Sequence, residues 1–193
     1  MSANSYIYIV LTSSGTYFSK MIKYYTKAPL NHASIAFDAE LNEVYSFGRK
    51  NAANPFNAGL VREDYRSPFF HTSECAVFRL KVTAEQYETM HHLVKEMMNK
   101  QHTYKYHLLG LIGVMLQIEL HRENAYFCSQ FVSYVLSHAG VSPVRKPPHF
   151  VKPSDFEDAD MLQELFRGSL AAYTKQPESL NSGGMEIIKA RII

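Results

Sequence analysis

The stretch Tyr126-Phe127-Cys128-Ser129-Gln130-Phe131-Val132-Ser133-Tyr134-Val135-Leu136-Ser137-His138-Ala139-Gly140 decides the fold. Apolar residues recur at positions 127, 131 and 135 and at 132, 136 and 139, the spacing of a helix with one broad buried face. Gly140 stands where a helix ends, because glycine enters the left-handed region without a Cβ clash. Pro143 follows and cannot continue a helix. The pattern predicts a helix over residues 127–139.

Cys128 falls in the first turn of this helix. Unpaired N–H groups at a helix start carry partial positive charge, which favours a thiolate over a thiol. The same N–H groups, that of Cys128 above all, are placed to hold an oxyanion formed when the sulfur attacks a carbonyl. The alternative is a buried cysteine that only packs. The position makes Cys128 a candidate nucleophile.

The composition is that of an ordinary globular domain. The chain has 193 residues, of which 46% are hydrophobic and 20% charged. Its net charge of +2 is too small to predict binding to nucleic acid or to an anionic membrane. Two cysteines, Cys75 and Cys128, make no disulfide framework and predict reduced thiols in a cytoplasmic compartment. Cys75 begins a strand and is expected only to pack.

The sequence predicts neither a leader nor an integral membrane segment. The first residues lack the basic segment of a signal peptide. No apolar run reaches membrane-spanning length. The longest, Leu108–Ile118, is predicted to be a buried helix, with contact to lipid as the alternative.

Alternation and chain-breaking residues predict the remaining elements. A hairpin is expected from His32–Phe37 and Glu43–Gly48, and Thr83 with Gln86 forms a capping-box pattern at a helix start. The expected strands cover residues 6–11, 32–37, 43–48 and 74–82, with a short one at 59–62 inside a long loop over 49–66. The expected helices cover residues 16–27, 83–100 and 154–166, with an apolar segment at 104–120 and a tail after 167.

His32 is the candidate base for Cys128 among nine histidines. It opens the first hairpin strand, and the small Ser34 and Ala36 on its own face leave room for a neighbour. His138 lies near the far end of the Cys128 helix, too far to serve it. No His-Glu-x-x-His or Cys-x-x-Cys spacing occurs, so neither a metal site nor a cofactor is predicted.

A third polar group is expected to orient the imidazole. If the hairpin turns near Asp38, His32 lies opposite Ser46 or close to it, and Ser46 is the candidate. A slip of one residue would move it to the other face. Glu43 is chemically stronger but is expected to face away.

Three segments together resemble the circularly permuted papain-like superfamily, in its YiiX-like branch. Lys27-Ala28-Pro29-Leu30-Asn31-His32-Ala33-Ser34-Ile35 resembles the histidine strand, Tyr126-Phe127-Cys128-Ser129-Gln130-Phe131-Val132 the cysteine helix, and Pro153-Ser154-Asp155-Phe156 the Pro-x-Asp segment that follows. NlpC-type cell-wall peptidases are unpermuted relatives, and the lecithin:retinol acyltransferase group is a permuted one. Histidine before cysteine is the permuted order.

The resemblance implies an α+β, papain-like fold in which the cysteine helix packs on an antiparallel sheet. The resemblance covers roughly residues 5–160, and we expect a permuted papain-like catalytic domain over residues 1–167, with 168–193 as a tail or extra strand. Cys128 would be the nucleophile and His32 the base. Ser46 stands at the third catalytic position, where relatives usually carry Glu, His, Asn or Gln.

We therefore expect a cysteine hydrolase, an amidase or peptidase that cleaves an amide bond in a peptide or peptidoglycan-type substrate through an acyl-enzyme. A lipid or thioester acyltransferase using the same site is one alternative. A catalytically decayed binding module is another, because Ser46 carries no charge to stabilise an imidazolium. A generic α+β binding domain is the third, and it requires His32 and Cys128 to lie far apart.

Overall fold

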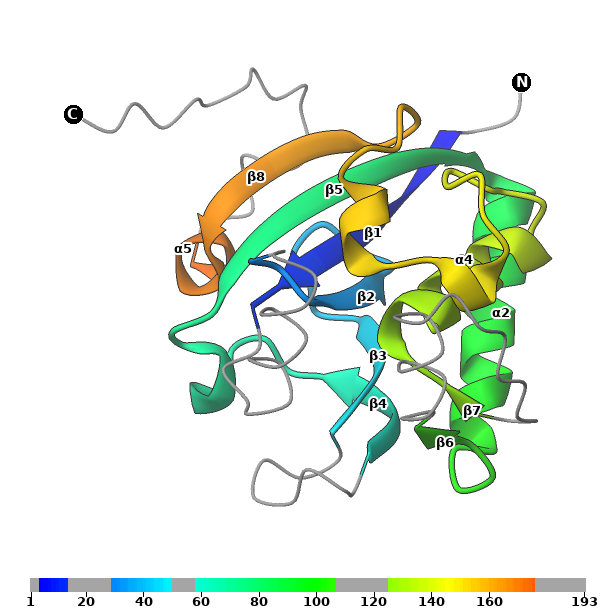
Figure 1. The fold of residues 1–193 in the computed structure, drawn as a ribbon, viewed down its shortest axis with the longest axis horizontal. Helices are drawn as coiled ribbons and strands as arrows, with labels where there is room; N and C mark the ends of the chain where they lie inside the picture. The colour runs from blue at the N-terminus through cyan, green and yellow to red at the C-terminus, as the bar shows by residue number, and fades with distance from the viewer. Residues whose placement is uncertain (1–3, 14–28, 50–57, 107–124, 176–193) are drawn as a thin grey trace.

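The described part of this computed structural model comprises residues 4–13, 29–49, 58–106 and 125–175. The expected helix at 16–27, most of the apolar segment at 104–120 and all residues after 175 lie outside these ranges. Within them the chain forms a mixed α+β fold around a six-stranded antiparallel sheet (Figure 1). The coarse fold class is confirmed.

The sheet is built around β1 (Asn4–Thr12), which pairs antiparallel with β2 (His32–Ala36) on one side and β5 (Glu74–Thr83) on the other. The apolar run of β1 is buried on both faces, as expected of an interior strand. The edges are formed by β4 and β8. In spatial order the strands are β4 (Ala58–Glu63), β3 (Val44–Arg49), β2 (His32–Ala36), β1 (Asn4–Thr12), β5 (Glu74–Thr83) and β8 (Gln163–Ser169).

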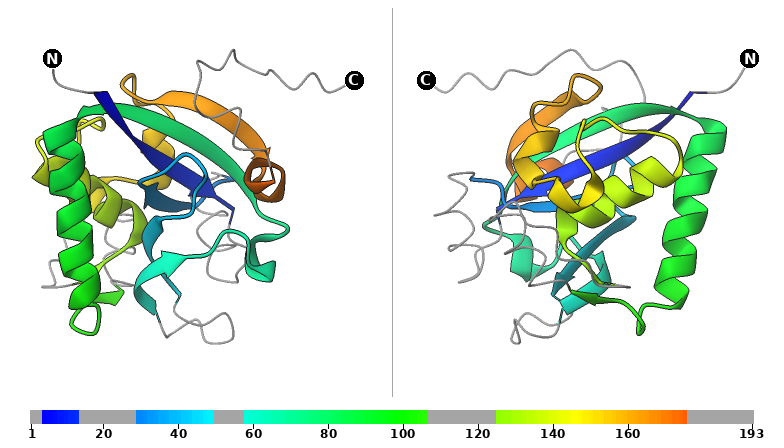
Figure 2. Two further views of the ribbon diagram at one scale, coloured as in Figure 1. Left: turned by 180° about the vertical axis from the view of Figure 1, so that it is seen from behind. Right: turned by 45° about the vertical axis from the view of Figure 1, so that its right-hand side comes forward.

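Alternating residues of β1 feed two separate cores. Ile9 and Leu11 belong to the larger one, which includes Phe131 of α4 (Cys128–His138) and Met90 of α2 (Ala84–Asn99). Figures 1 and 2 show α2 and α4 together on one side of the curved sheet. Val10 points to the smaller core, which the helix α5 (Leu170–Thr174) helps to close.

Both main helices begin and end where the sequence predicts. Thr83 and Gln86 form the expected capping box at the start of α2. Gly140, just beyond α4, has a φ of 71°, a conformation that glycine adopts without strain. The short parallel pair of β6 (Lys105–Tyr106) and β7 (Ala125–Tyr126) leads directly into α4. The start of α4 is therefore tied to the second, two-stranded sheet.

The helix expected over 154–166 is wrong. A single 3-10 turn, η3 (Pro153–Phe156), follows another such turn, η2 (Pro148–Phe150), and residues 163–169 form β8 against β5. This strand crosses the boundary expected at residue 167, and α5 follows where a tail or extra strand was expected. The strand β8 thus completes one edge of the sheet, and a short helix follows it.

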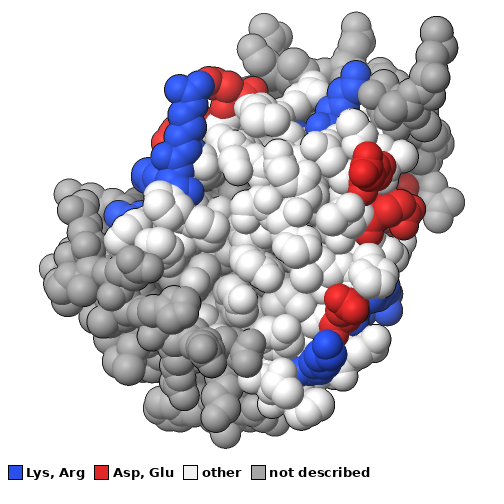
Figure 3. Space-filling view, turned by 90° about the vertical axis from the view of Figure 1, so that its right-hand side faces the viewer, with Lys and Arg blue, Asp and Glu red and all other residues white. Residues whose placement is uncertain are grey.

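The face formed by α2, α4 and β7 carries few charges. Figure 3 shows this side, with Lys, Arg, Asp and Glu gathered toward the rim of the described surface. Aromatic rings follow one another there, from Tyr126 to Tyr134 at 5.3 Å and on to His138 at 6.1 Å between ring centroids. Among the described residues this face offers no basic patch for a polyanion, and none of the described helices is long and apolar enough to cross a membrane.

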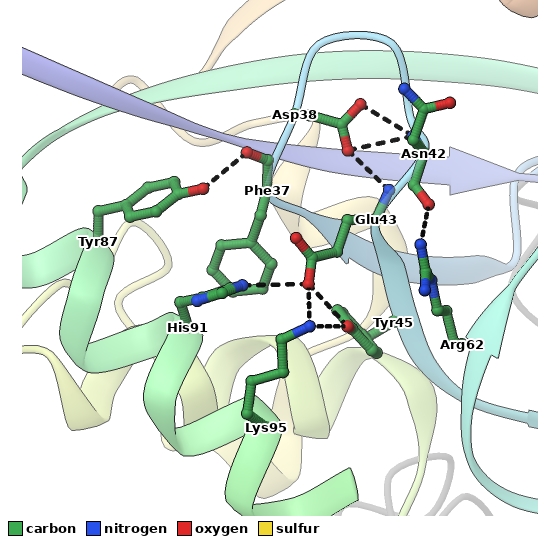
Figure 4. Close-up of polar contacts among 9 residues, drawn as sticks. All are labelled: Phe37, Asp38, Asn42, Glu43, Tyr45, Arg62, Tyr87, His91 and Lys95. Atoms are coloured by element: carbon green, nitrogen blue, oxygen red, sulfur yellow. Dashed lines mark hydrogen bonds and ion pairs between the residues drawn. The ribbon is translucent and has the colours of Figure 1, made fainter.

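Glu43 anchors the β2–β3 hairpin to α2 (Figure 4). Its Oε1 accepts hydrogen bonds from His91 Nε2 at 3.0 Å, from Tyr45 OH at 2.8 Å and from Lys95 Nζ. Burial opposes ionisation of Glu43, but the hydrogen bonds from Lys95, Tyr45 and His91 lower its pKa to about 2. Glu43 therefore faces the helix, as expected, and not His32.

We expect Glu43→Gln to lower the free energy of unfolding by about 1 kcal/mol, because the carboxylate is only partly shielded from water. A depressed pKa contributes stability that is present above about pH 4.5 and is lost as the pH falls through about 2. Urea unfolding at neutral and at acid pH should therefore show the difference between the two proteins shrinking in acid. The matched control is Glu96→Gln, because Glu96 lies on the exposed side of α2; this substitution should change the free energy of unfolding little. An equal loss in both variants would contradict the anchoring role.

Candidate active site

Cys128 is the first residue of α4 and is 5% exposed. The extended Phe127 precedes it, so the chain turns into the helix at the cysteine itself. The sulfur accepts hydrogen bonds from the backbone N–H groups of Ser129 and Ala33. Both donors favour a negative charge on sulfur; Ser129 belongs to the first turn of α4, as expected of a helix start, whereas Ala33 comes from β2.

His32, the first residue of β2, meets this sulfur. Its side chain forms a hydrogen bond with Cys128, so the strand start and the helix start come together although they are distant in sequence. The Nε2 atom of His32 lies 2.8 Å from Glu63 Oε1. An imidazole has two ring nitrogens, so Nδ1 is the one left for the sulfur. The order is thiol, imidazole, carboxylate.

Glu63, which is not among the residues expected at the site, supplies the carboxylate that contacts His32. It ends β4, the edge strand, and its side chain is 7% exposed. Oε1 accepts from His32 and, at 2.7 Å, from Ser46 Oγ; Oε2 accepts from Ser34 Oγ at 2.7 Å. The alternation of Val61, Glu63 and Tyr65 was a signal that a strand carried this side chain into the fold.

Ser46 contacts the carboxylate rather than the imidazole. The hairpin pairs Ile35 with Tyr45 and Ala36 with Val44, which puts Ser34 level with Ser46 and His32 level with Gly48. The expected register was therefore displaced by two residues, and an even displacement leaves His32 and Ser46 on one face. The contact that was expected to orient His32 from Ser46 is made by Glu63 instead, because the longer glutamate side chain reaches the imidazole.

Gly48 leaves the space in which these groups meet. A Cβ at this position would lie 3.1 Å from Ser46 Oγ, 3.3 Å from Glu63 Oε1 and 3.6 Å from His32 Cε1. The first two contacts are closer than ordinary van der Waals contact. The absence of a side chain thus allows the hydroxyl, the carboxylate and the imidazole to converge.

The charges within the site favour an ion pair. Burial alone would lower the pKa of His32, but the charge of Glu63 and hydrogen bonds with Cys128 and Glu63 raise it to about 10. Burial would raise the pKa of Glu63, but His32 and the two serine hydroxyls lower it to about 2. Burial also opposes the thiolate, yet His32 and the two backbone N–H groups lower the pKa of Cys128. These shifts favour the thiolate of Cys128, the imidazolium of His32 and the carboxylate of Glu63.

The second cysteine has the opposite environment. Cys75 is the second residue of β5 and is 1% exposed in the smaller core. Burial and the nearby charge of Glu74 raise the pKa of its thiol to about 12. Cys75 is therefore an internal reference for an ordinary buried thiol in any labelling experiment.

No protein-family model matches the chain, and no curated protein matches its sequence. The described residues hold no group of three or more His, Cys, Asp or Glu side chains arranged to bind a metal ion. The chemistry available within these residues is that of a thiol beside an imidazole and a carboxylate.

The ion pair predicts an unusual pH dependence of stability. The raised pKa of His32 contributes stability that is complete below about pH 6.5 and is lost as the pH rises toward 10. The lowered pKa of Cys128 contributes stability that is complete above about pH 9 and is lost as the pH falls. Between these limits the two slopes oppose each other, because folding moves one proton from sulfur to imidazole.

We therefore expect the pair to add little pH dependence between about pH 6.5 and 9. In Cys128→Ala the opposing slope is gone, so the free energy of unfolding should fall as the pH rises through this range. Urea unfolding at several pH values checks this, with Cys75→Ala as the control that keeps the wild-type profile. Parallel profiles in Cys128→Ala and the wild type would mean that no proton is transferred.

Proposed function

We propose that this protein is a cysteine hydrolase that cleaves an amide bond in a small peptide or peptidoglycan-type substrate. One observation carries the proposal: the thiol of Cys128, the imidazole of His32 and the carboxylate of Glu63 form a continuous line of hydrogen bonds. A nucleophile beside a base that is itself oriented by a third group is the arrangement of nucleophilic acyl transfer.

The fold is consistent with a circularly permuted papain-like domain. The histidine strand and the carboxylate strand precede the cysteine helix in the chain, and that helix packs on an antiparallel sheet. We infer the permuted arrangement from this order and from the resemblance of the three sequence segments. Glu63, a charged group, removes the main reason for regarding the site as decayed.

In the proposed reaction Cys128 acts first as the nucleophile and later as the leaving group, and His32 first gives up a proton and then takes one back. The Cys128 thiolate attacks the carbonyl carbon, and the oxyanion is held by the backbone N–H of Cys128. The amide C–N bond breaks as the His32 imidazolium gives its proton to the leaving nitrogen. Water then loses a proton to His32 and attacks the thioester, which releases the acid and restores the thiolate.

Glu63 keeps its charge through both half-reactions and stabilises the imidazolium.

The Cys128 nucleophile must be a reduced thiol, so we place the protein in a reducing compartment such as the cytoplasm.

The proposal is tested by adduct formation on Cys128. The protein is incubated with a panel of acyl amides, esters and thioesters, and intact mass and peptide mapping locate any acyl group. We expect a thioester adduct on Cys128 that decays in water, and none on Cys75 or in Cys128→Ala. An adduct released faster by added amines or alcohols than by water would favour an acyltransferase. Absence of any adduct, together with equal iodoacetamide reactivity of the two cysteines, would sink the proposal.

A further inference from the structure

The Glu63 carboxylate is held by more hydroxyl groups than a simple triad requires. Both of its oxygens accept a serine hydroxyl, from β3 on one side and β2 on the other. One of these serines, Ser34, is itself fully buried and accepts a hydrogen bond from Tyr65 OH at 2.8 Å. The contacts therefore continue past the carboxylate into the smaller core.

Tyr65 lies at the far end of this line, two residues beyond β4. It is 2% exposed, and its ring packs edge-on against Phe70 at 4.8 Å between centroids. Burial, followed by the charge of Glu63, raises the pKa of Tyr65 well above its usual value, so it keeps its proton. A tyrosine that remains neutral is a permanent donor.

The direction of the hydrogen bonds follows from counting protons. A serine hydroxyl has one proton and two acceptor positions. Because Ser34 Oγ accepts from Tyr65, its own proton is free to point at Glu63 Oε2.

We propose that Tyr65 is a positioning residue, which fixes the Glu63 carboxylate against His32 through Ser34. The role rests on the proposed function, since it matters only if His32 acts on Cys128. The titratable and charged groups that face Glu63 within the described residues are His32 from β2 and Tyr65 after β4, with Cys128 of α4 beyond His32. Tyr65 acts on His32 only indirectly, through Ser34 and Glu63.

The test compares two buried tyrosines that differ in this contact. Tyr65→Phe removes only the hydroxyl. Tyr173→Phe is the matched control, because Tyr173 is 5% exposed in the same core and its hydroxyl donates to the backbone oxygen of Ala39 at 2.9 Å, away from the site. Both variants lose one buried hydrogen bond, so their thermal stabilities should fall by similar amounts.

The readout is the imidazolium N–H proton of His32, followed by proton NMR of resting protein containing ¹⁵N-labelled histidine. A proton held between Nε2 and a carboxylate gives a low-field signal that exchanges slowly with water, and its loss in Glu63→Gln assigns it. We expect exchange about 5-fold faster in Tyr65→Phe and about 10-fold faster in Ser34→Ala, from the usual strengths of neutral and charged hydrogen bonds. Tyr173→Phe should stay within about 2-fold of wild type.

Wild-type exchange in Tyr65→Phe, or equal acceleration in Tyr173→Phe, would overturn the positioning role. No substrate enters this measurement, so its outcome is separate from adduct formation on Cys128. An acyl adduct with no effect of Tyr65→Phe rejects the positioning role alone. A clear effect of Tyr65→Phe in a protein that forms no adduct and whose two cysteines react equally with iodoacetamide rejects the hydrolase, while Tyr65 and Ser34 still position Glu63 against His32.

Discussion

His32→Ala should slow the alkylation of Cys128 by iodoacetamide about 100-fold near neutral pH. Burial by itself disfavours the thiolate, and the hydrogen bond and charge of His32 are the largest contributions that lower the pKa of Cys128. Without them the thiol is protonated at neutral pH and loses most of its thiolate fraction. Some of that loss is recovered, because a thiolate of higher pKa is intrinsically more nucleophilic.

The experiment follows each cysteine separately by peptide mass spectrometry. His91→Ala is the matched control, since His91 also pairs with a carboxylate but lies on α2 against Glu43. It should leave the rate at Cys128 within about 2-fold, because nothing joins it to the sulfur. Cys75 should react slowly in every variant, given a pKa raised to about 12 by burial and Glu74. Unchanged reactivity of Cys128 in His32→Ala would remove the basis of the proposed nucleophile.

Phe47→Ala should lower the free energy of unfolding by about 3–5 kcal/mol, the usual cost of removing a buried phenyl ring. Phe47 of β3 is fully buried, and its ring lies 5.2 Å from those of both Phe131 in α4 and Tyr126 in β7. It joins the sheet to the element that carries the cysteine. The cavity should loosen α4 as well as destabilise the domain.

Urea unfolding monitored by circular dichroism measures this cost, and Cys128 alkylation in the folded variant reports on the helix. Phe69→Ala is the control, because Phe69 is 43% exposed and should cost less than about 1 kcal/mol. A loss below about 1 kcal/mol for Phe47→Ala would show that this ring does not hold the helix to the sheet.

The sequence predicted the elements that carry their own local signals. The hairpin that starts at His32 shows a two-residue alternation, and the helix that starts at Cys128 shows helical spacing with a glycine at its end. Both signals depend only on residues close together in sequence, so they can be recognised without knowing the fold. The positive φ of Gly140 is the same kind of local information.

The parts that depend on distant pairing were missed. The segment Gln163–Ser169 has no apolar alternation, and it is a strand because β5 supplies hydrogen-bond partners, with an irregularity at Val77 and Phe78. Glu63 was hidden in a segment read as loop, and its partners come from two other strands. Whether Ser46 or Glu63 reaches the His32 imidazole depends on a shift of two residues in the hairpin register. Sequence periodicity does not determine that shift, because it leaves the same side chains on the same face.

The assembly of the site from separated strands and a helix has a consequence for the newly made chain. Bringing together elements that are far apart in sequence costs entropy, so we expect the contacts between them to form late in folding. The donors to the Cys128 sulfur include Ala33 in β2, which arrives only when α4 docks on the sheet. We therefore expect a nascent or partly folded chain to carry two ordinary thiols, and Cys128 to gain its lowered pKa only when α4 docks on the sheet. If the proposed thiolate forms, the rate at which an electrophile labels Cys128 would report the fraction of chains that have reached the native state.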